Sequence, residues 1–341
     1  MQTRHQKIHS PSDKGLITRR TVLVNAFAAL SVLFAGGVGA QAYPSKAVRV
    51  VVPIAAGGLV DILARNITPE LSRVWGQSVI VENRPGGNTI LGAVVVAKSA
   101  PDGYTLLMTN PTTASMNQFL YKKLPYDAER DFQMVFNIGF APTIMAIHPA
   151  VPANTLQEFV AYVKSRPGQV NYGSFGIGST AHIDLELFSQ RAGIRMNHIP
   201  YKGVADALPA AVAGQIELVS PGVRVALAMI KAGKLKVLSI NAPRRSAALP
   251  EVPTLAEAGY PNLVMGGWFG FLAPSGVPRP IIDKIAGDIA KILTIEEVRE
   301  KVLTTGGLEP LLQGPDQFTE FVREERIRYS QLIKSIKVSL D

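Results

Sequence analysis

Two glycine-containing turns hold the residues whose types and spacing suit the binding of a small anion. In "PIAAGGLVDIL" and in "NYGSFGIGSTAH", an apolar run leads through glycines into a helical pattern. Glycine allows positive φ and close approach to the backbone, and the free N–H groups of a helix start attract carboxylate or phosphate. A tight turn with no ligand is the alternative for each. The candidate contacts are Ala56, Gly57, Gly58 and Asp61 in the first turn and Ser174, Phe175, Gly176, Gly178, Ser179 and His182 in the second.

Polar residues follow other apolar runs in the same way, in "TLLMTNPTT", "HIPYKG" and "ELVSPG". Ligands of open α/β sheets bind outside the carboxyl ends of the strands, so we expect these loops to belong to the same site. An ordinary connection is the alternative for each loop taken alone. The further candidate contacts are Thr109, Asn110, Thr112, Tyr201 and Ser220.

Signatures of catalysis are missing from the chain. It contains no cysteine, no G-x-x-x-x-G-K-[ST] phosphate loop, no G-x-S-x-G elbow and no HExxH spacing. The one enzymatic alternative is a secreted hydrolase in which Ser179 and His182 form a dyad, although no acid completes it. Otherwise we expect His182 to donate a hydrogen bond from the helix face. The sequence therefore predicts a protein that is not an enzyme and that uses no cofactor and no metal.

The elements that must position these residues follow an alternating order. Short apolar runs alternate with helical patterns along residues 43–341, which predicts βαβ units and mainly parallel sheets in two domains. Thr155, with a glutamate three residues later, predicts a capped helix start. The segment from "PRPIIDKIAG" to "QLIKSI" predicts consecutive surface helices. The predicted strands are "VRVVVPI", "SVIVEN", "TLLMTN", "TIMAIHP", "QVNYGSFG", "RMNHIPY", "IELVSPG" and "KVLSINA".

Residues 1–42 have the order of a secretory signal peptide. A basic segment with Arg19 and Arg20 precedes an uncharged apolar run that ends in "AQA". We predict cleavage after Ala42, which would release residues 43–341 into the periplasm. The arginine pair resembles a twin-arginine signal, with ordinary Sec export as the alternative. An uncleaved membrane anchor is the alternative to cleavage.

Basic residues are scattered along the chain. There are 35 Lys and Arg residues against 26 Asp and Glu residues, a formal net charge of +9, and the signal segment holds five of the basic residues and one of the acidic ones. The rest of the chain is therefore mildly basic, which suits a small anionic ligand. No run of aromatic and basic residues lies along one element, which argues against nucleic-acid binding.

Nine motifs, in order, resemble one known family. They are "YPSKAVRVVVPIAAGGLVDILAR", "VENRPGG", "PDGYTLLM", "LYKKLPYD", "PGQVNYGSFGIGSTAH", "HIPYKG", "IKAGKLKVL", "LPEVPTLAEAGYP" and "WFGFLAPSGVP". Over essentially all of residues 43–341, the chain is similar to the Bug (Bordetella uptake gene) family, the periplasmic substrate-binding proteins of tripartite tricarboxylate transporters.

The resemblance implies an α/β fold of the type II periplasmic-binding-protein class, with two lobes and a ligand cleft between them. We place lobe 1 at residues 43–145 plus 266–341 and lobe 2 at 146–265. In such proteins the two glycine-containing turns come from opposite lobes and hold a ligand carboxylate. The implied protein is a monomer that delivers a small organic anion to the membrane permease of the transporter. A ligand receptor for a membrane sensor kinase is the alternative.

The chain departs from the family pattern at two places that bear on the ligand. Ala55, Leu59 and Val60 occupy positions where relatives have a proline and a longer glycine run with a threonine. Pro221 and Gly222 stand where many relatives place an aspartate and a polar neighbour. A ligand ammonium then has no obvious partner, so we expect a mono- or dicarboxylate or an aromatic acid rather than an amino acid.

Overall fold

The computed structural model describes residues 2–3, 43–242, 244–261, 263, 265–304, 307–336 and 340. The chain divides into two compact units, Met1–Tyr43 and Pro44–Asp341, and both sheets belong to the second unit. Nearly all of the predicted signal peptide lies outside the described residues. Within the described residues, no helix combines the length and apolar character needed to cross a membrane.

A six-stranded sheet has the order β11-β4-β10-β3-β1-β2. In its parallel part, β1 pairs with β2 on one side and with β3 on the other. β1 is almost entirely buried, as is typical of a parallel strand covered on both faces. Its other strands are antiparallel, since β10 pairs in that sense with both β3 and β4, and β11 with β4. The strands are β1 (Val48–Val52), β2 (Val79–Asn83), β3 (Thr105–Thr109), β4 (Phe132–Pro142), β10 (Gly266–Pro274) and β11 (Glu309–Gln313).

A five-stranded sheet has the order β7-β6-β8-β5-β9. β6 pairs in parallel with β7 and β8, whereas β5 is antiparallel to β8 and β9. Both sheets are therefore mixed, and the prediction of mainly parallel sheets was wrong. The strands are β5 (Ile144–Ile147), β6 (Asn171–Ser174), β7 (Asn197–Pro200), β8 (Leu218–Val219) and β9 (Lys236–Ile240).

The chain crosses between the two sheets twice. It leaves β4 of the first sheet and enters β5 of the second at Thr143, and it returns between the end of β9 and Gly266, the first residue of β10. At the crossing, Asn241 N–H donates to Thr143 O at 2.8 Å. The lobe limits given above, 43–145 plus 266–341 and 146–265, stay a prediction.

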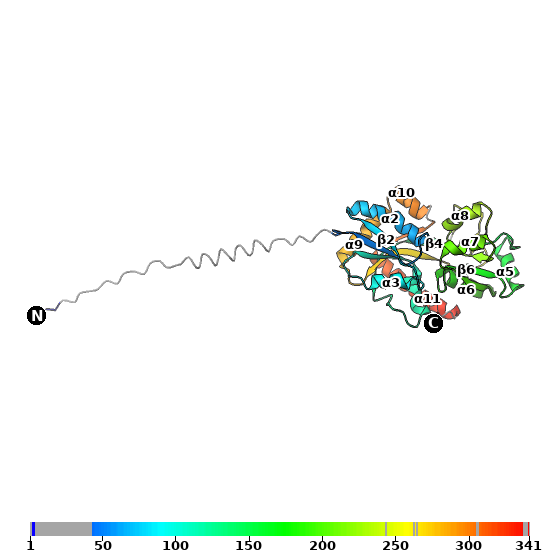
Figure 1. Ribbon diagram of the computed structural model, residues 1–341, viewed down its shortest axis with the longest axis horizontal. Helices are drawn as coiled ribbons and strands as arrows, with labels where there is room; N and C mark the ends of the chain where they lie inside the picture. Colours follow the sequence, from blue (N-terminus) through cyan, green and yellow to red (C-terminus); the bar gives the residue numbers. More distant parts are fainter. Residues whose placement is uncertain are drawn as a thin grey trace. The chain divides into compact units, whose positions relative to one another are not determined.

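The helices cover these sheets, and Figure 1 shows α5, α6, α7 and α8 gathered about the second sheet. Thr155 caps α5 as predicted, because its side chain accepts from Glu158 N–H at 3.1 Å. The helices are α2 (Leu59–Trp75), α3 (Ile90–Ala97), α4 (Asn117–Leu120), α5 (Leu156–Lys164), α6 (Thr180–Ala192), α7 (Val204–Val212), α8 (Val223–Lys231), α9 (Arg279–Ile292), α10 (Glu296–Arg299) and α11 (Pro315–Ile336), with the π-helical turns η1 (Thr112–Met116) and η2 (Glu300–Thr304).

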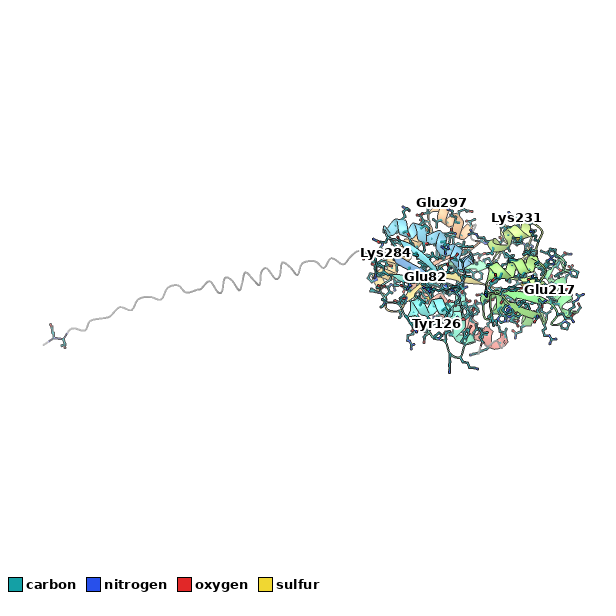
Figure 2. The ribbon with its side chains drawn as sticks, in the orientation of Figure 1. Glu82, Tyr126, Glu217, Lys231, Lys284 and Glu297 are labelled. Carbon is teal, nitrogen blue, oxygen red and sulfur yellow. The ribbon has the colours of Figure 1, made fainter. Side chains whose placement is uncertain are left out.

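The C-terminal helix α11 joins the cores of both sheets. Its first half places Phe318 edge-on to Trp268 of β10, with ring centroids 5.0 Å apart. Its second half places Tyr329 and Ile333 in the core beneath α6 and the second sheet. Charged side chains of both signs stand on the surface, among them Lys231 of α8 and Glu297 of α10 (Figure 2).

We expect Gly270→Ala to destabilise the fold by about 1–3 kcal/mol, because a Cβ there would lie 2.7 Å from Phe136 O and 2.7 Å from the Phe318 ring. The matched control is Gly287→Ala in α9, where a Cβ meets nothing within 4 Å. Alanine should stabilise that helix by about 0.5–1 kcal/mol. Urea unfolding of both variants measures the difference. Equal stability of the two variants would contradict the close packing at β10.

Candidate ligand-binding site

The first glycine-containing turn connects β1 to α2 and is held by the Asp61 carboxylate. Gly57 has a φ of +83°, which favours glycine. Asp61 is 3% exposed and accepts from Gly57 N–H at 3.0 Å, from Arg65 Nε at 3.0 Å and from Asn83 Nδ2 at 2.9 Å. Burial raises the pKa of Asp61, but these bonds and the Arg65 charge outweigh it and hold that pKa below its usual value. The carboxylate therefore fixes the shape of the turn.

Two residues that sequence reasoning did not select complete this turn. Asn83 also donates to Ile54 O at 3.1 Å, and Arg65 Nη2 donates to Asn83 Oδ1 at 2.9 Å. Asn83 was not among the candidate contacts chosen from the sequence. Its place could have been found, because it ends the strand that pairs in parallel with β1, opposite Val52.

The second glycine-containing turn connects β6 to α6. Ser179 is the N-cap of α6 and accepts from His182 N–H at 3.4 Å, while Gly178 N–H donates to the ring nitrogen Nδ1 of His182 at 3.0 Å. The Nδ1 atom of the ring thus accepts a hydrogen bond, which leaves the proton of the neutral ring on Nε2, so the expectation that His182 donates a hydrogen bond stays a prediction. The described residues contain no hydrogen bond between Ser179 Oγ and the His182 ring, so the proposed dyad is not assembled.

Three stacked rings contact the second turn. The ring of His198 lies between His182, at a centroid distance of 3.9 Å, and Tyr172, at 4.9 Å. His198 Nε2 is 2.6 Å from Ser174 Oγ, and that hydroxyl donates to Gly176 O at 3.0 Å. Burial lowers the pKa of His182 to about 3 and that of His198 to about 4. Both rings are therefore neutral around pH 7.

A third segment follows β3 and reaches the second turn. Thr109 Oγ1 lies 2.6 Å from Thr113 Oγ1, and Asn110 Oδ1 accepts from Thr112 N–H at 3.1 Å. Thr112 Oγ1 is 3.3 Å from Thr180 Oγ1 in the first turn of α6. This contact joins the carboxyl end of a strand in the first sheet to that of a strand in the second.

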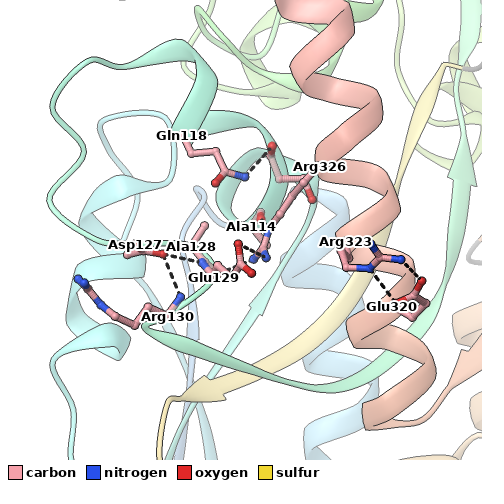
Figure 3. A network of polar contacts seen from close by, with 10 residues as sticks. Ala114, Gln118, Asp127, Ala128, Glu129, Arg130, Glu320, Arg323 and Arg326 are labelled. Atoms are coloured by element: carbon pink, nitrogen blue, oxygen red, sulfur yellow. Dashed lines mark hydrogen bonds and ion pairs between the residues drawn. The ribbon is translucent and has the colours of Figure 1, made fainter.

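Arg326 of α11 supports this third segment (Figure 3). Its Nε donates to Ala114 O in η1 at 2.9 Å, and its Nη2 donates to Ala128 O at 2.6 Å. The guanidinium is largely buried, and burial lowers the pKa of Arg326. Sequence reasoning did not find this residue, because 212 positions separate it from Ala114.

The remaining predicted residues lie at the ends of β7 and β8. Tyr201 N–H donates to Ser174 O at 3.1 Å, and its ring packs on Gly173, where a Cβ would be 3.3 Å from Cε2. Ser220 is fully buried, and its hydroxyl has no hydrogen-bond partner among the described residues. A Cβ at Gly222 would lie 3.9 Å from Leu59 Cδ2, which brings the start of α8 against the start of α2.

Two cavities lie apart from these loops. One of about 230 Å³ is lined by residues that include Arg279 and Arg326, and one of about 390 Å³ by residues that include Thr155 and Glu257. No predicted site residue lines either of them. Within the described residues, no group of three or more His, Asp or Glu side chains is arranged to hold a metal ion.

The electrostatics of the loops favour an anion. The starts of α2, α6 and α8 each carry unpaired N–H groups and the positive end of a helix dipole. The first turns of α6 and α8 contain no acidic residue, and the carboxylate of Asp61 in α2 is already bonded within its own turn. An anionic group at one of these helix starts would accept hydrogen bonds from its N–H groups and be stabilised by the positive end of its dipole.

A buried carboxylate lies between the second turn and the crossing. Asp184 of α6 is 1% exposed and accepts from Gly266 N–H at 2.8 Å. Burial raises the pKa of Asp184 to about 7, although the Gly266 bond and the Arg328 charge oppose the rise. The contact fixes α6 to the first residue of β10.

Residues 63–338 match the family described as "Tripartite tricarboxylate transporter family receptor". Protein BugT of Bordetella pertussis is 33% identical over 329 residues, 95% of this chain and 99% of BugT. The periplasmic binding protein BugD superposes with a TM-score of 0.80 at 29% identity, over 87% of this chain and 99% of BugD. This similarity identifies the two sheets as the two lobes of a periplasmic-binding-protein fold.

Two similar structures contain a bound acid. Rpa4515 of R. palustris with adipate has a TM-score of 0.83 and 31% identity, over 87% of this chain and 99% of that one. MatC of Rhodopseudomonas palustris with bound malate has a TM-score of 0.80 and 32% identity, over 85% of this chain and 100% of that one. Both proteins are therefore similar to this chain over nearly their whole length.

We expect Asp184→Asn to change how stability depends on pH. The pKa of Asp184 is higher in the folded chain than the usual 3.8, so the folded state holds the proton more tightly and the wild type loses stability as pH rises through about 7. From pH 5 to pH 8, the wild type should lose about 3 kcal/mol relative to the variant. Urea unfolding at several pH values measures this. Asp206→Asn, at an exposed position of α7, is the control and should follow the wild type.

Proposed function

Because the chain belongs to the family of tripartite tricarboxylate transporter receptors, we propose that it captures a small organic carboxylate and delivers it to the membrane permease of such a transporter. The resemblance to the Bug proteins and the two-lobed α/β fold predicted from the nine motifs are confirmed. In the proposal the protein acts in the periplasm after removal of residues 1–42. It binds its ligand without changing it.

The observation that carries the proposal is that helix starts next to the predicted loops have no free carboxylate: the first turns of α6 and α8 contain no acidic residue, and Asp61 of α2 is bonded within its own turn. The start of α8 lies against Leu59 of α2, and Thr180 of α6 lies against Thr112. A carboxylate can accept hydrogen bonds from free N–H groups and from hydroxyls at once. Thr112, Ser179 and the unpartnered hydroxyl of Ser220 supply such groups near these helix starts.

The side chains around the loops narrow the ligand class. Leu59 and Val60 give the start of α2 an apolar character, and no carboxylate follows β8, where Pro221 and Gly222 lie. A ligand with a second charge of the same sign or with an apolar body suits these surroundings better than an amino acid, whose ammonium would need an anionic partner. Adipate in Rpa4515 and malate in MatC are acids of this class.

The hydrolase alternative has weaker support. Ser179 Oγ is occupied as the N-cap of α6, and the neutral ring of His182 bonds to Gly178 N–H instead. A base with a pKa of about 3 removes a proton from a hydroxyl poorly at neutral pH. We therefore assign Ser179 to holding the turn and the ligand.

Titration calorimetry of residues 43–341 against adipate, malate, benzoate and glutamate tests the ligand class. We expect saturable binding of at least one of the first three acids and weaker binding of glutamate, because its ammonium finds no carboxylate near Gly222. The solution is analysed afterwards by chromatography. Conversion of an acid into a product would contradict the receptor function, and tighter binding of glutamate would contradict the ligand class.

Ser179→Ala separates a receptor from an enzyme. The variant loses an N-cap, which should cost about 1 kcal/mol of stability, and one hydroxyl near the ligand, which should weaken binding roughly tenfold. Ser165→Ala, at an exposed position after α5, is the matched control and should bind like the wild type. Ester hydrolysis by the wild type that disappears in Ser179→Ala is the result that the receptor function forbids.

A further inference from the structure

Arg224 connects the two lobes at the start of α8. Its Nη1 donates to Lys301 O in η2 at 3.0 Å, and a Cβ at Gly307 would lie 3.8 Å from Arg224 Cβ. α8 is joined to β8 of the second sheet, whereas η2 packs against α2 and β11 of the first sheet. The arginine therefore reaches from one lobe to the other.

Several other polar contacts join the lobes, among them a bond from Gln190 of α6 to Ser335 O of α11 at 3.0 Å and the ion pair of Arg244 with Glu309, and the contact of Arg224 differs from two of them in its place. The bond from Gly266 N–H to Asp184 lies where the chain crosses, so a rotation about the crossing changes it least. The contact of Thr112 with Thr180 lies at the ligand loops themselves. Lys301 belongs neither to the crossing nor to those loops, and Arg224 lies in the first turn of α8 with its guanidinium on η2, so their bond requires that the lobes lie close together.

The position of Arg224 in its helix is unfavourable for the helix itself. A positive side chain in the first turn opposes the helix dipole, and no acidic residue in the first turn of α8 compensates it. Its bond to Lys301 goes to a backbone carbonyl, and among the described residues its remaining guanidinium N–H groups have no hydrogen-bond partner. The interaction with η2 is thus the favourable contact that the side chain makes.

We propose that Arg224 is a latch that holds the two lobes closed and slows the escape of the ligand. The proposal rests on the proposed receptor function for its role in ligand release. A latch that forms only in the closed state leaves association of the ligand unchanged and acts on dissociation. Arg224 is a positioning residue here, because it acts through the lobes and no contact with the ligand is needed.

The test measures the distance between the lobes in three variants. The chain has no cysteine, so spin labels at Lys164→Cys in α5 and Lys291→Cys in α9, both exposed, report on one lobe each. Arg224→Ala removes the side chain that forms the latch. Arg224→Lys keeps the positive charge and one donor nitrogen. Arg245→Ala is the matched control, because Arg245 bonds to Glu257 within its own lobe at 2.9 Å.

Pulsed electron paramagnetic resonance is recorded without ligand and with adipate. We expect the short-distance population to fall in Arg224→Ala, to be partly kept in Arg224→Lys, and to be unchanged in Arg245→Ala. With adipate, dissociation measured by stopped flow should be roughly three- to tenfold faster in Arg224→Ala, with the association rate unchanged.

Two results would overturn the latch. One is a distance distribution of Arg224→Ala that superposes on that of the wild type, and the other is a wild type with no short-distance population in either condition. Failure of adipate to bind any variant speaks against adipate as a ligand, and failure of the whole acid panel against the proposed function. In that case the distances without ligand still decide whether Arg224 holds the lobes together.

Discussion

The constraint on which the site depends is that its helix starts carry no free anion of the chain's own. The positive dipole ends of α6 and α8 have no acidic side chain in their first turns to compensate them. The one carboxylate in these first turns, Asp61, is consumed by its own turn. A receptor needs this arrangement, because an internal anion at the same place would compete with the ligand.

The electrostatic potential at the second turn does not change with pH around neutrality. The stacked rings of His182 and His198 lie directly beneath the second turn, and burial keeps both uncharged around neutral pH. An imidazole that became protonated near pH 7 would add a positive charge that depends on pH. The rings pack against each other and bond to Gly178 N–H and Ser174 Oγ, so the second turn is shaped by histidines that stay neutral around pH 7.

The elements beside the loops were predictable because their signals are local. Runs of buried Val and Leu marked β1 and β3, and the capping pair of Thr155 and Glu158 marked α5. β10 was missed because its sequence, rich in glycine and buried on both faces, lacks alternation, and its partner β4 is distant in the chain. β11 was missed within the run of C-terminal helices because it is short, contains Pro310 and is interrupted by an irregularity in its pairing.

The site itself shows the same division. Glycines and hydroxyls at strand ends could be selected from their residue types alone, because the conformation of a turn depends on residues that are adjacent in the sequence. Their supports could not, because Arg326 and Ala114 meet only after α11 folds onto η1. The bond that the Nδ1 atom of His182 accepts was not foreseen for the same reason. Its hydrogen-bonding role depends on the Gly178 N–H that the turn presents and on His198 from another strand.

The two tryptophans of the chain are fluorescent side chains in different surroundings. Trp75 at the end of α2 donates from Nε1 to Asp288 of α9 at 2.8 Å. Trp268 is fully buried in β10, two residues after the crossing strand begins, with its ring against Phe318 and its Nε1 unpartnered within the described residues. An indole in so apolar a place emits at short wavelength. Its emission would therefore move to longer wavelength if the core around β10 opened to water.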